Sequence, residues 1–481
     1  MAVLVNIEPK AVFHYFEEIC NIPHGSGNLQ KISDYLVSFA RERNLEVIQD
    51  KELNVIIKAP GTAGYEDKEP VILQGHMDMV AVKDNNADID MKTEGLRVKT
   101  DGEYVWAEGT SLGGDDGIAV AYCLALLDSK TIPHPPLEVV ITTNEETGME
   151  GAAAIDLSGL KSKKMINIDN EVEGQFITSC AGGARVYSKL PVTRDVTYTG
   201  AMVLAVRVEG LLGGHSGEMI KCGRGNANII LARTLLEACD KLNLNLISFD
   251  GGSADNAIPS SAVAQIVIGN RDLDTFKQSV SATEAAVKGE LEVKDPDLKI
   301  TVSEAEGSFD KAVTAENTMK VLTMISTMPD GVQAMSSAVE GLVETSLNLG
   351  IVATKEGVIT VEQSVRSSIE SSKEFLIRKV RTISEMFGGE VEVGGNYPGW
   401  KFRQSSELRD HMVAVYREMY GRDPRIEAIH AGLECGLLSE KIKDLDCISI
   451  GPDMEDIHSP KERLSVKSTA NVWEYLKAVL K

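Results

Sequence analysis

The sequence predicts an α/β protein built on a mostly parallel sheet, into which a second, α+β domain is inserted. Helical patterns alternate with short apolar, β-branched runs over residues 1–186, and the alternation resumes over 396–481 after a Gly/Pro-rich junction. Such alternation favours a parallel sheet with helices on its faces. Residues 187–395 instead pair strands with long helices, as α+β domains do. We therefore expect one domain from 1–186 and 396–481, and an inserted domain from 187–395.

The elements of the first domain follow from the spacing of its apolar residues. Helices are predicted near 29–43 and over Asp116–Leu127. Several apolar runs are typical of strands buried on both faces, and each ends shortly before a residue that can bind a metal. These runs are 71–75 before His76, 137–143 before the Glu145-Glu146 pair, 165–168 before Asp169, and 446–452 before His458.

The inserted domain is predicted to contain two similar cycles of strands and helices. The first cycle has strands near 203–208 and 262–268 and helices near 225–242 and 272–290; the second has strands near 342–353 and 357–363 and helices near 314–327 and 372–387. No residue-level repeat accompanies the second cycle, so the similarity is one of pattern.

The composition is that of a large soluble enzyme. The 481 residues exceed what one hydrophobic core usually supports, which favours two or more domains. A net charge of −23 argues against a nucleic-acid partner, because affinity for nucleic acids comes from Lys and Arg. We find neither a run of about 18 apolar residues nor a basic leader with an apolar core, and expect a cytoplasmic protein without a membrane partner. Seven cysteines without paired spacing indicate reduced thiols.

The polar residues at the predicted strand ends indicate a hydrolase with two metal ions. The candidate ligands are His76, Asp115, Glu146, Asp169 and His458. Because His76 and Asp78 are two positions apart, both side chains would leave the same face of an extended strand. Asp78 could then hydrogen-bond the second imidazole nitrogen of a ligand and raise its basicity. A surface histidine beside a capped turn is the alternative.

Asp115 lies in the glycine loop Gly113-Gly114-Asp115-Asp116-Gly117, directly before a predicted helix. Glycines let the backbone approach a ligand closely, and a carboxylate at this point could bridge two cations. An N-cap without a catalytic role is the alternative. Asp115 and Asp116 could also divide the two tasks between them.

The adjacent acids Glu145 and Glu146 would repel each other unless cations stabilise their charge. A two-metal hydrolase needs one carboxylate as a ligand and one as a general base, and this pair could supply both. Solvated loop acids are the alternative for the pair, and a turn residue is the alternative for Asp169. Oxygen-rich ligation with two histidines suits two Zn²⁺ ions per chain, with Mn²⁺ or Co²⁺ as alternatives.

These motifs together resemble a known family. The segments that carry the resemblance are His76-Met77-Asp78-Met79-Val80, Gly113-Gly114-Asp115-Asp116-Gly117, Glu145-Glu146-Thr147-Gly148-Met149-Glu150-Gly151, Ile168-Asp169-Asn170-Glu171, Ala181-Gly182-Gly183 and Ile457-His458-Ser459-Pro460. In this order they resemble the metallopeptidase family that includes carboxypeptidase G and aminoacylase, in its aminoacyl-histidine dipeptidase group. The resemblance runs through nearly the whole chain.

The resemblance implies a zinc-exopeptidase-like catalytic domain. The roles that it implies are Asp115 as the bridging ligand, His76, Glu146, Asp169 and His458 as the other ligands, Glu145 as the general base and Asp78 as a supporting carboxylate. The broader family often has Lys or Met where Gly117 stands here, so this position carries no implied role.

For the inserted domain, the resemblance implies a lid and dimerisation domain, and hence a homodimer. Gly213-Gly214-His215-Ser216-Gly217 resembles the lid motif whose histidine stabilises the oxyanion, from the same chain or from the partner. Asn256, Arg366, His430 and Glu434 lie in segments that resemble those holding the substrate. Arg366 suits a bidentate grip on a free carboxylate, with a surface ion pair as the alternative.

The function implied is that of a cytosolic dipeptidase that hydrolyses unblocked dipeptides, including Xaa-His, with water activated by two metals and Glu145 as the base. An N-acyl-amino-acid deacylase of the same family is one alternative, and it would require an acylated amino end. A non-catalytic metal-binding protein is the other. The presence of both Glu145 and Glu146 weighs against it.

Overall fold

The computed structural model describes residues 2–196, 200–305 and 310–481, and the chain forms two compact units. Unit 1 comprises Met1–Cys180, Trp400–Ala428 and Leu433–Lys481, and unit 2 comprises Ala181–Gly399 and Ile429–Gly432. The chain leaves unit 1 after Cys180 and returns to it at Trp400, so unit 2 is an insertion in the sequence.

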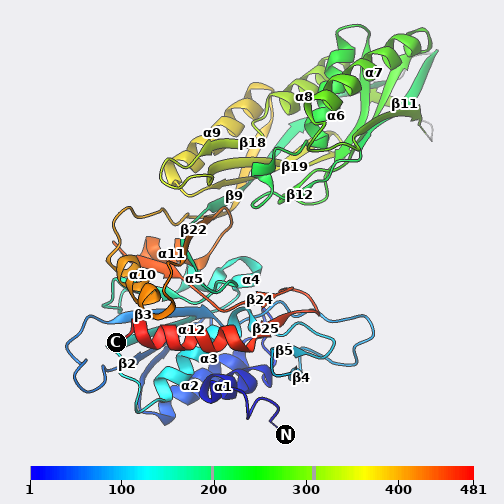
Figure 1. Cartoon of the computed structure of the whole chain (residues 1–481). Coiled ribbons are helices and arrows are strands. Elements are labelled where there is room, and N and C mark those ends of the chain that lie inside the picture. The colour runs from blue at the N-terminus through cyan, green and yellow to red at the C-terminus, as the bar shows by residue number, and fades with distance from the viewer. Residues whose placement is uncertain (1, 197–199, 306–309) are drawn as a thin grey trace. The chain divides into compact units, whose positions relative to one another are not determined.

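Unit 1 is built on an eight-stranded sheet with the order β1-β2-β6-β3-β7-β23-β8-β22 (Figure 1). Its strands are β1 (Glu46–Gln49), β2 (Val55–Ala59), β3 (Val71–His76), β6 (Leu137–Thr142), β7 (Lys164–Asn167), β8 (Gln175–Cys180), β22 (Arg425–Ile429) and β23 (Asp446–Ser449). The central strands β6, β3, β7 and β23 run parallel, whereas β1, β2 and β8 pair antiparallel. The predicted α/β class is confirmed, with parallel pairing confined to the centre of the sheet.

Helices cover both faces of this sheet, as parallel strands require. Figure 1 shows α1 (Lys10–Cys20), α2 (Gln30–Glu42), α3 (Gly114–Asp128) and α12 (Val466–Val479) on one side, and α5 (Glu150–Ala154) and α11 (Glu434–Lys441) on the other. The remaining elements of unit 1 are α4 (Glu145–Gly148), α10 (Glu407–Tyr420) and a four-stranded sheet of β24 (Met454–Glu455), β25 (Arg463–Ser465), β5 (Tyr104–Ala107) and β4 (Val98–Thr100).

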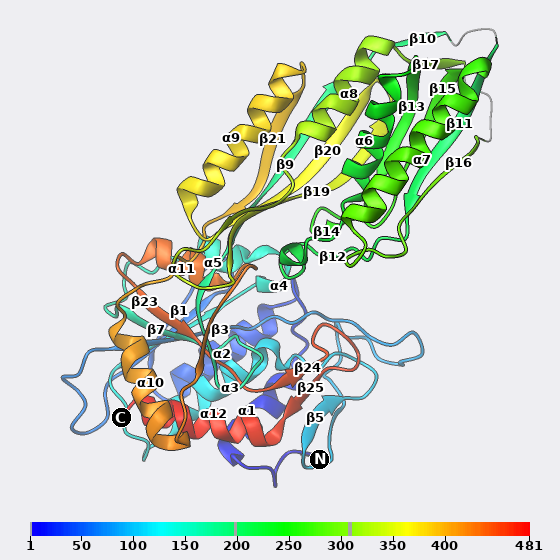
Figure 2. The ribbon, with the colours of Figure 1, turned by 45° about the horizontal axis from the view of Figure 1, so that its top comes forward.

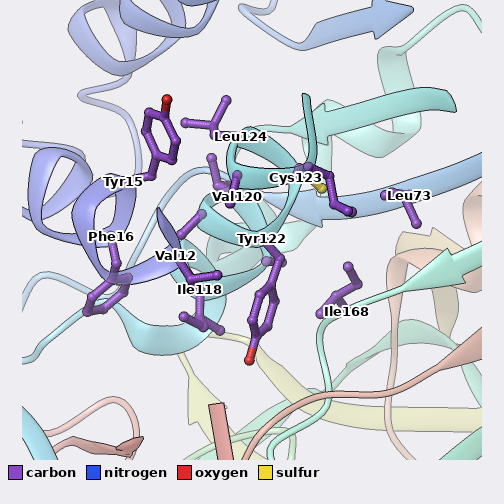
Figure 3. Close-up of a cluster of buried hydrophobic side chains, with 14 of the residues drawn as sticks. Val12, Tyr15, Phe16, Leu73, Ile118, Val120, Tyr122, Cys123, Leu124 and Ile168 are labelled. Atoms are coloured by element: carbon purple, nitrogen blue, oxygen red, sulfur yellow. The ribbon is translucent and has the colours of Figure 1, made fainter. Parts of the chain in front are cut away.

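The core of unit 1 centres on α3, which is apolar on all sides. Every residue from Gly114 to Leu127 is buried, including the aspartates of its first turn. Val12 and Phe16 of α1 and Leu73 of β3 belong to the same cluster as the side chains of α3 (Figure 3). A helix that packs on every face cannot rotate or slide without losing apolar burial. The packing therefore fixes the position of the turn that carries Asp115.

Unit 2 is built on a nine-stranded antiparallel sheet with the order β16-β11-β15-β13-β19-β20-β9-β21, and β18 also pairs with β19. Its strands are β9 (Gly182–Pro191), β11 (Ala201–Glu209), β13 (Leu244–Gly251), β15 (Ala262–Gly269), β16 (Lys299–Glu304), β18 (Gly331–Met335), β19 (Val343–Lys355), β20 (Val358–Ser367) and β21 (Glu390–Tyr397). Two short pairs join β10 (Arg194–Val196) to β17 (Lys311–Val313) and β12 (Gly214–His215) to β14 (Ala257–Ile258).

Four helices cover one face of this antiparallel sheet (Figure 2). They are α6 (Ala227–Cys239), α7 (Leu273–Glu290), α8 (Ala315–Thr327) and α9 (Glu370–Met386). The two predicted cycles correspond to α6 and α7 with their strands and to α8 and α9 with theirs, so the α+β character of this segment is confirmed. Among the described residues, no helix combines the length and apolar character needed to span a membrane.

Candidate metal centre

The predicted metal-site residues of unit 1 gather at the carboxyl ends of the central strands. His76 ends β3, Asp78 follows it, Asp115 lies in the first turn of α3, Glu145 and Glu146 begin α4, Asp169 follows β7, and His458 lies between β24 and β25. Parallel strands end at the same edge of a sheet, which is where ligands bind in such folds. The sheet thus brings together residues that are far apart in the sequence.

The carboxylate of Asp115 stands between two histidines. Its Oδ1 lies 3.1 Å from Nε2 of His76, and its Oδ2 lies 3.2 Å from Nε2 of His458. Nε2 of His76 is also 3.6 Å from Oδ1 of Asp169, and Nε2 of His458 is 2.9 Å from Oε1 of Glu146. The side chains therefore form two groups that share Asp115.

The ligand atoms are close enough together to hold metal ions. The candidate sets are His76 with Asp116 and Asp169, His76 with Glu145 and Glu146, and Asp115 with Glu146 and His458. Asp116 also has a structural task, because its Oδ2 accepts a hydrogen bond of 3.1 Å from the backbone N–H of His76. Imidazole nitrogens and carboxylate oxygens are ligands that Zn²⁺, Mn²⁺ and Co²⁺ accept. The donor set fits divalent cations.

Burial makes the negative charges of this site costly. It raises the pKa of Asp169 to about 7, and it raises the pKa of Glu145 well above the usual glutamate value. The neighbouring acid Glu146 adds to both effects. Without a cation, these carboxyls therefore bind protons more readily than exposed ones, and a bound cation would stabilise the ionised forms.

The neighbouring carboxylates raise the pKa values of the two histidines. Burial lowers the pKa of His76 more than any other single influence, but its carboxylate partners Asp115, Asp169 and Asp78 together raise it well above its ordinary value. Hydrogen bonds to Asp115 and Glu146 raise the pKa of His458 to about 10. In the absence of metal ions, protons on the two histidines thus neutralise part of the negative charge of the carboxylates. Bound cations could take over this task.

Asp78 connects His76 to α4. Its backbone oxygen lies 3.0 Å from Nδ1 of His76 and its Oδ1 lies 3.6 Å from the same nitrogen, an arrangement that leaves Nε2 for the shared site. The backbone N–H of Glu145 donates to Oδ1 of Asp78 at 3.1 Å, and the hydroxyl of Ser26 donates to its Oδ2 at 2.8 Å. Ser26 is a contact that the sequence does not predict, because nothing local links this turn to β3.

Glu434 lies in unit 1 and is fully buried. Its Oε2 accepts hydrogen bonds of 2.6 Å from Nε2 of Gln74 and 2.6 Å from Oγ1 of Thr142, and burial raises its pKa to about 7. The sequence predicts a substrate contact for Glu434. Gln74 and Thr142 hold only Oε2, whereas Oε1 has no hydrogen-bond partner, so the substrate contact stays a prediction.

The other predicted substrate residues lie in unit 2. His215 ends β12, Asn256 precedes β14, Arg366 lies in β20, and His430 follows β22. Arg366 stands opposite Ser346 in the β19–β20 pair, and the hydroxyl of Ser346 is 2.7 Å from Nε2 of His430. Strand pairing thus places Arg366 opposite Ser346, and a side-chain hydrogen bond places His430 at the same serine.

Arg366 is a buried cation without an acidic partner. Its residue is 9% exposed, its Nε has no hydrogen-bond partner, and among the described residues no carboxylate forms an ion pair with it. Its Nη1 donates a hydrogen bond to the hydroxyl of Tyr397 at 3.5 Å. Burial and then the charge of Arg366 lower the pKa of His215, and they lower that of His430 to about 4. The group therefore offers one positive charge and two neutral imidazoles, which suits a carboxylate.

The chain is similar to known peptidases over its full length. The family described as peptidase family M20/M25/M40 matches residues 72–481. The cytosol non-specific dipeptidase of Escherichia coli (strain K12) is 36% identical over 481 residues, covering 100% of this chain and 99% of that protein. The crystal structure of aminoacylhistidine dipeptidase from Vibrio alginolyticus has a TM-score of 0.94 and 36% identity, with 99% of this chain and 97% of that chain covered.

More distant structures share the fold alone. Aminopeptidase PepT from Bacillus cereus ATCC 10987 has a TM-score of 0.56 at 17% identity, with 98% of each chain covered. The match to the family and to the two dipeptidases confirms the resemblance that the motifs predict.

Cation binding at this centre is expected to release protons. The pKa of about 10 for His458 in the absence of metal means that its imidazole is protonated at pH 8, and a cation must displace that proton from Nε2. Addition of Zn²⁺ to metal-free protein at pH 8, in dilute buffer with an indicator dye, should acidify the solution. The variant His458→Asn should release fewer protons per chain. Equal release by both proteins would contradict the assignment of His458 as a ligand.

Proposed function

The chain belongs to peptidase family M20/M25/M40, and from this premise we propose that it is a cytosolic dipeptidase. It hydrolyses unblocked dipeptides of broad composition, including Xaa-His, and uses two divalent cations per chain, preferably Zn²⁺. The names of its relatives support the substrate class and the compartment: one is a cytosol non-specific dipeptidase and the other an aminoacylhistidine dipeptidase, each 36% identical to this chain.

The observation that carries the proposal is the position of Asp115 between His76 and His458. Oxygens on the two sides of one carboxylate lie 3.1 and 3.2 Å from the two imidazoles. A carboxylate in this position can join two cation sites, with His76 and Asp169 on one side and Glu146 and His458 on the other. Two cations held there would polarise the scissile carbonyl and favour ionisation of a water molecule.

Glu145 is the proposed general base. It stands beside the ligand Glu146 and shares a cluster with His76, and its backbone N–H is held by Asp78. A base in this reaction takes a proton from the attacking water and returns it to the leaving amine. Burial raises the pKa of Glu145, which suits a carboxylate that must both accept and release a proton near neutral pH.

The residues of unit 2 complete the proposal. Arg366 binds the free carboxylate of the dipeptide, with Asn256 and His430 as further substrate contacts, and neutral His215 donates a hydrogen bond to the oxyanion of the tetrahedral intermediate. Unit 2 serves as the lid and dimerisation domain of a homodimer, and His215 comes from the same chain or from the second copy. Glu434 is a further proposed substrate contact, with Oε2 held by Gln74 and Thr142 and Oε1 without a partner.

The substrate class can be tested with one series of related compounds. Free dipeptides should be hydrolysed, whereas N-acetylated and C-amidated versions of the same dipeptides should be poor substrates, because the site recognises two free ends. The screen uses metal-free protein reloaded with Zn²⁺, Mn²⁺ or Co²⁺. Preferential hydrolysis of the N-acetylated compounds would instead identify an N-acyl-amino-acid deacylase.

The adjacent glutamates should behave differently when changed. Glu145→Gln should keep both metal ions but lower kcat by about 10²- to 10⁴-fold, the usual contribution of a general base. Glu146→Gln should weaken metal binding, which elemental analysis after dialysis would detect. If Glu145→Gln lost metal and Glu146→Gln kept it, the two roles would have to be exchanged.

Arg366 should select for the free carboxylate. Arg366→Ala should raise KM strongly for dipeptides and leave the already slow hydrolysis of dipeptide amides nearly unchanged, because an amide has no charge to pair with the guanidinium. Arg366→Lys is the matched control that retains the charge but loses the planar fork. Equal losses on dipeptides and amides would show that Arg366 has a structural task.

A further inference from the structure

Glu462 is a buried acid that has no direct part in the proposed reaction. Its residue is 3% exposed, and it immediately precedes β25. Its carboxylate accepts three hydrogen bonds from consecutive backbone N–H groups: Oε2 from Leu112 at 2.8 Å and from Gly113 at 3.1 Å, and Oε1 from Gly114 at 2.7 Å. These amides lie at the N-terminus of α3, where the first N–H groups of a helix lack partners within the helix. Glu462 therefore caps α3 from a distant part of the chain.

The backbone of Glu462 holds a second segment. Its N–H donates to the carbonyl of Ser459 at 3.1 Å, and the hydroxyl of Ser459 donates to the carbonyl of Asp456 at 2.7 Å. These bonds close the turn that carries His458, whose φ of +58° lies in the left-handed region that few non-glycine residues adopt. Such a conformation persists only where its surroundings enforce it. Glu462 thus joins the turn of His458 to the loop that precedes Asp115.

Two glycines permit this contact. Gly113 has a φ of +69°, and a Cβ added to it would come within 2.9 Å of Sδ of Met79. A Cβ on Gly114 would lie 3.2 Å from Oε1 of Glu462 and 3.1 Å from Sδ of Met454. Side chains at these positions would push the loop away from the carboxylate. The glycine loop is therefore shaped for Glu462 as well as for the helix start.

We propose that Glu462 is a positioning residue that sets the separation between Asp115 and His458, and thereby the affinity of the cation site that these two residues form with Glu146. The inference rests on the two-metal function proposed above. Oδ2 of Asp115 and Nε2 of His458 are 3.2 Å apart, and each residue belongs to a segment that Glu462 holds. Residues that hydrogen-bond directly to metal ligands contribute about 10- to 100-fold to affinity, and we expect an effect of the same order from Glu462, which acts through the backbone of both segments.

The effect should be confined to one side of the centre. His76 and Asp169 lie at the ends of β3 and β7, and the hydrogen bonds of Glu462 go to neither strand. Loss of the Glu462 carboxylate should therefore weaken the site of Asp115, Glu146 and His458 far more than the site on the His76 side. A merely structural role would instead lower the stability of unit 1 and leave the ratio of the two affinities unchanged.

The test compares Glu462→Gln with Glu455→Gln. Glutamine has the shape of glutamate, but its NH₂ group faces backbone N–H donors and cannot accept their hydrogen bonds. Glu455 is the matched control because it is a glutamate in β24, close to Glu462 in the sequence. Its exposed carboxylate contacts Arg463 and Tyr104 and not the loop before Asp115. Metal-free full-length proteins are titrated with Zn²⁺ against a chromophoric chelator, which gives the affinity of each ion, and near-ultraviolet circular dichroism verifies the fold.

We expect the parent and Glu455→Gln to bind two ions alike, and Glu462→Gln to bind one of them about 10- to 100-fold more weakly. Its kcat should fall at limiting Zn²⁺, with KM unchanged, and should recover with excess Zn²⁺. If Glu462→Gln does not fold, Glu462→Asp, which shortens the reach of the carboxylate, takes its place. Unchanged affinities, or equal weakening of both, would overturn the proposal. A parent protein that binds no pair of ions would instead overturn the proposed function.

Discussion

The main constraint on unit 1 is that its fold must hold several carboxylates close together in a largely buried site. Asp78, Asp115, Asp116, Glu145, Asp169 and Glu434 surround His76 at one end of the sheet, and burial raises the pKa of four of them, Asp116, Glu145, Asp169 and Glu434. Two imidazoles cannot neutralise so many acids. Such crowding of buried acids is unfavourable in a folded protein unless cations bind to them. The fold thus holds a cluster of acids whose negative charge the neighbouring histidines do not fully neutralise.

The arrangement persists because each candidate ligand is fixed by contacts outside the site. Packing on every face of α3 fixes the turn of Asp115, and the parallel strands fix His76 and Asp169. The turn of His458 is the loop between the paired strands β24 and β25 of the four-stranded sheet, so the central strands do not fix it. Glu462, which immediately precedes β25, adds hydrogen bonds from this turn to the loop before Asp115.

The sequence predicts what is local and fails where contacts are distant. Apolar runs that end in His76, Asp169 or the Glu145-Glu146 pair indicate both a buried strand and a ligand, so the α/β class and the members of the site follow from periodicity. The antiparallel edges of the sheet do not follow, because a buried strand has the same pattern in either direction. Ser26 and Glu462 were equally inaccessible to prediction: a serine in a turn and a glutamate in a loop acquire their partners only when segments distant in sequence meet. Glu434 follows the same rule, since its hydrogen-bond partners Gln74 and Thr142 lie in β3 and β6.

Each unit contains buried charges that lack partners of opposite sign, and the sign of these charges differs between the two units. Unit 1 has an excess of buried acids, and unit 2 has Arg366, a buried cation for which the described residues offer no carboxylate. Burying an unpaired charge costs several kcal/mol in real proteins, so each arrangement lowers the stability of its unit in the absence of a ligand. A ligand that binds only the folded state stabilises it and so offsets this loss of stability. Cations would do so in unit 1 and a substrate carboxylate in unit 2. The residues whose unpaired charges lower the stability of the folded chain would therefore be the ones that bind the proposed ligands, with cations attracted to unit 1 and an anion to unit 2.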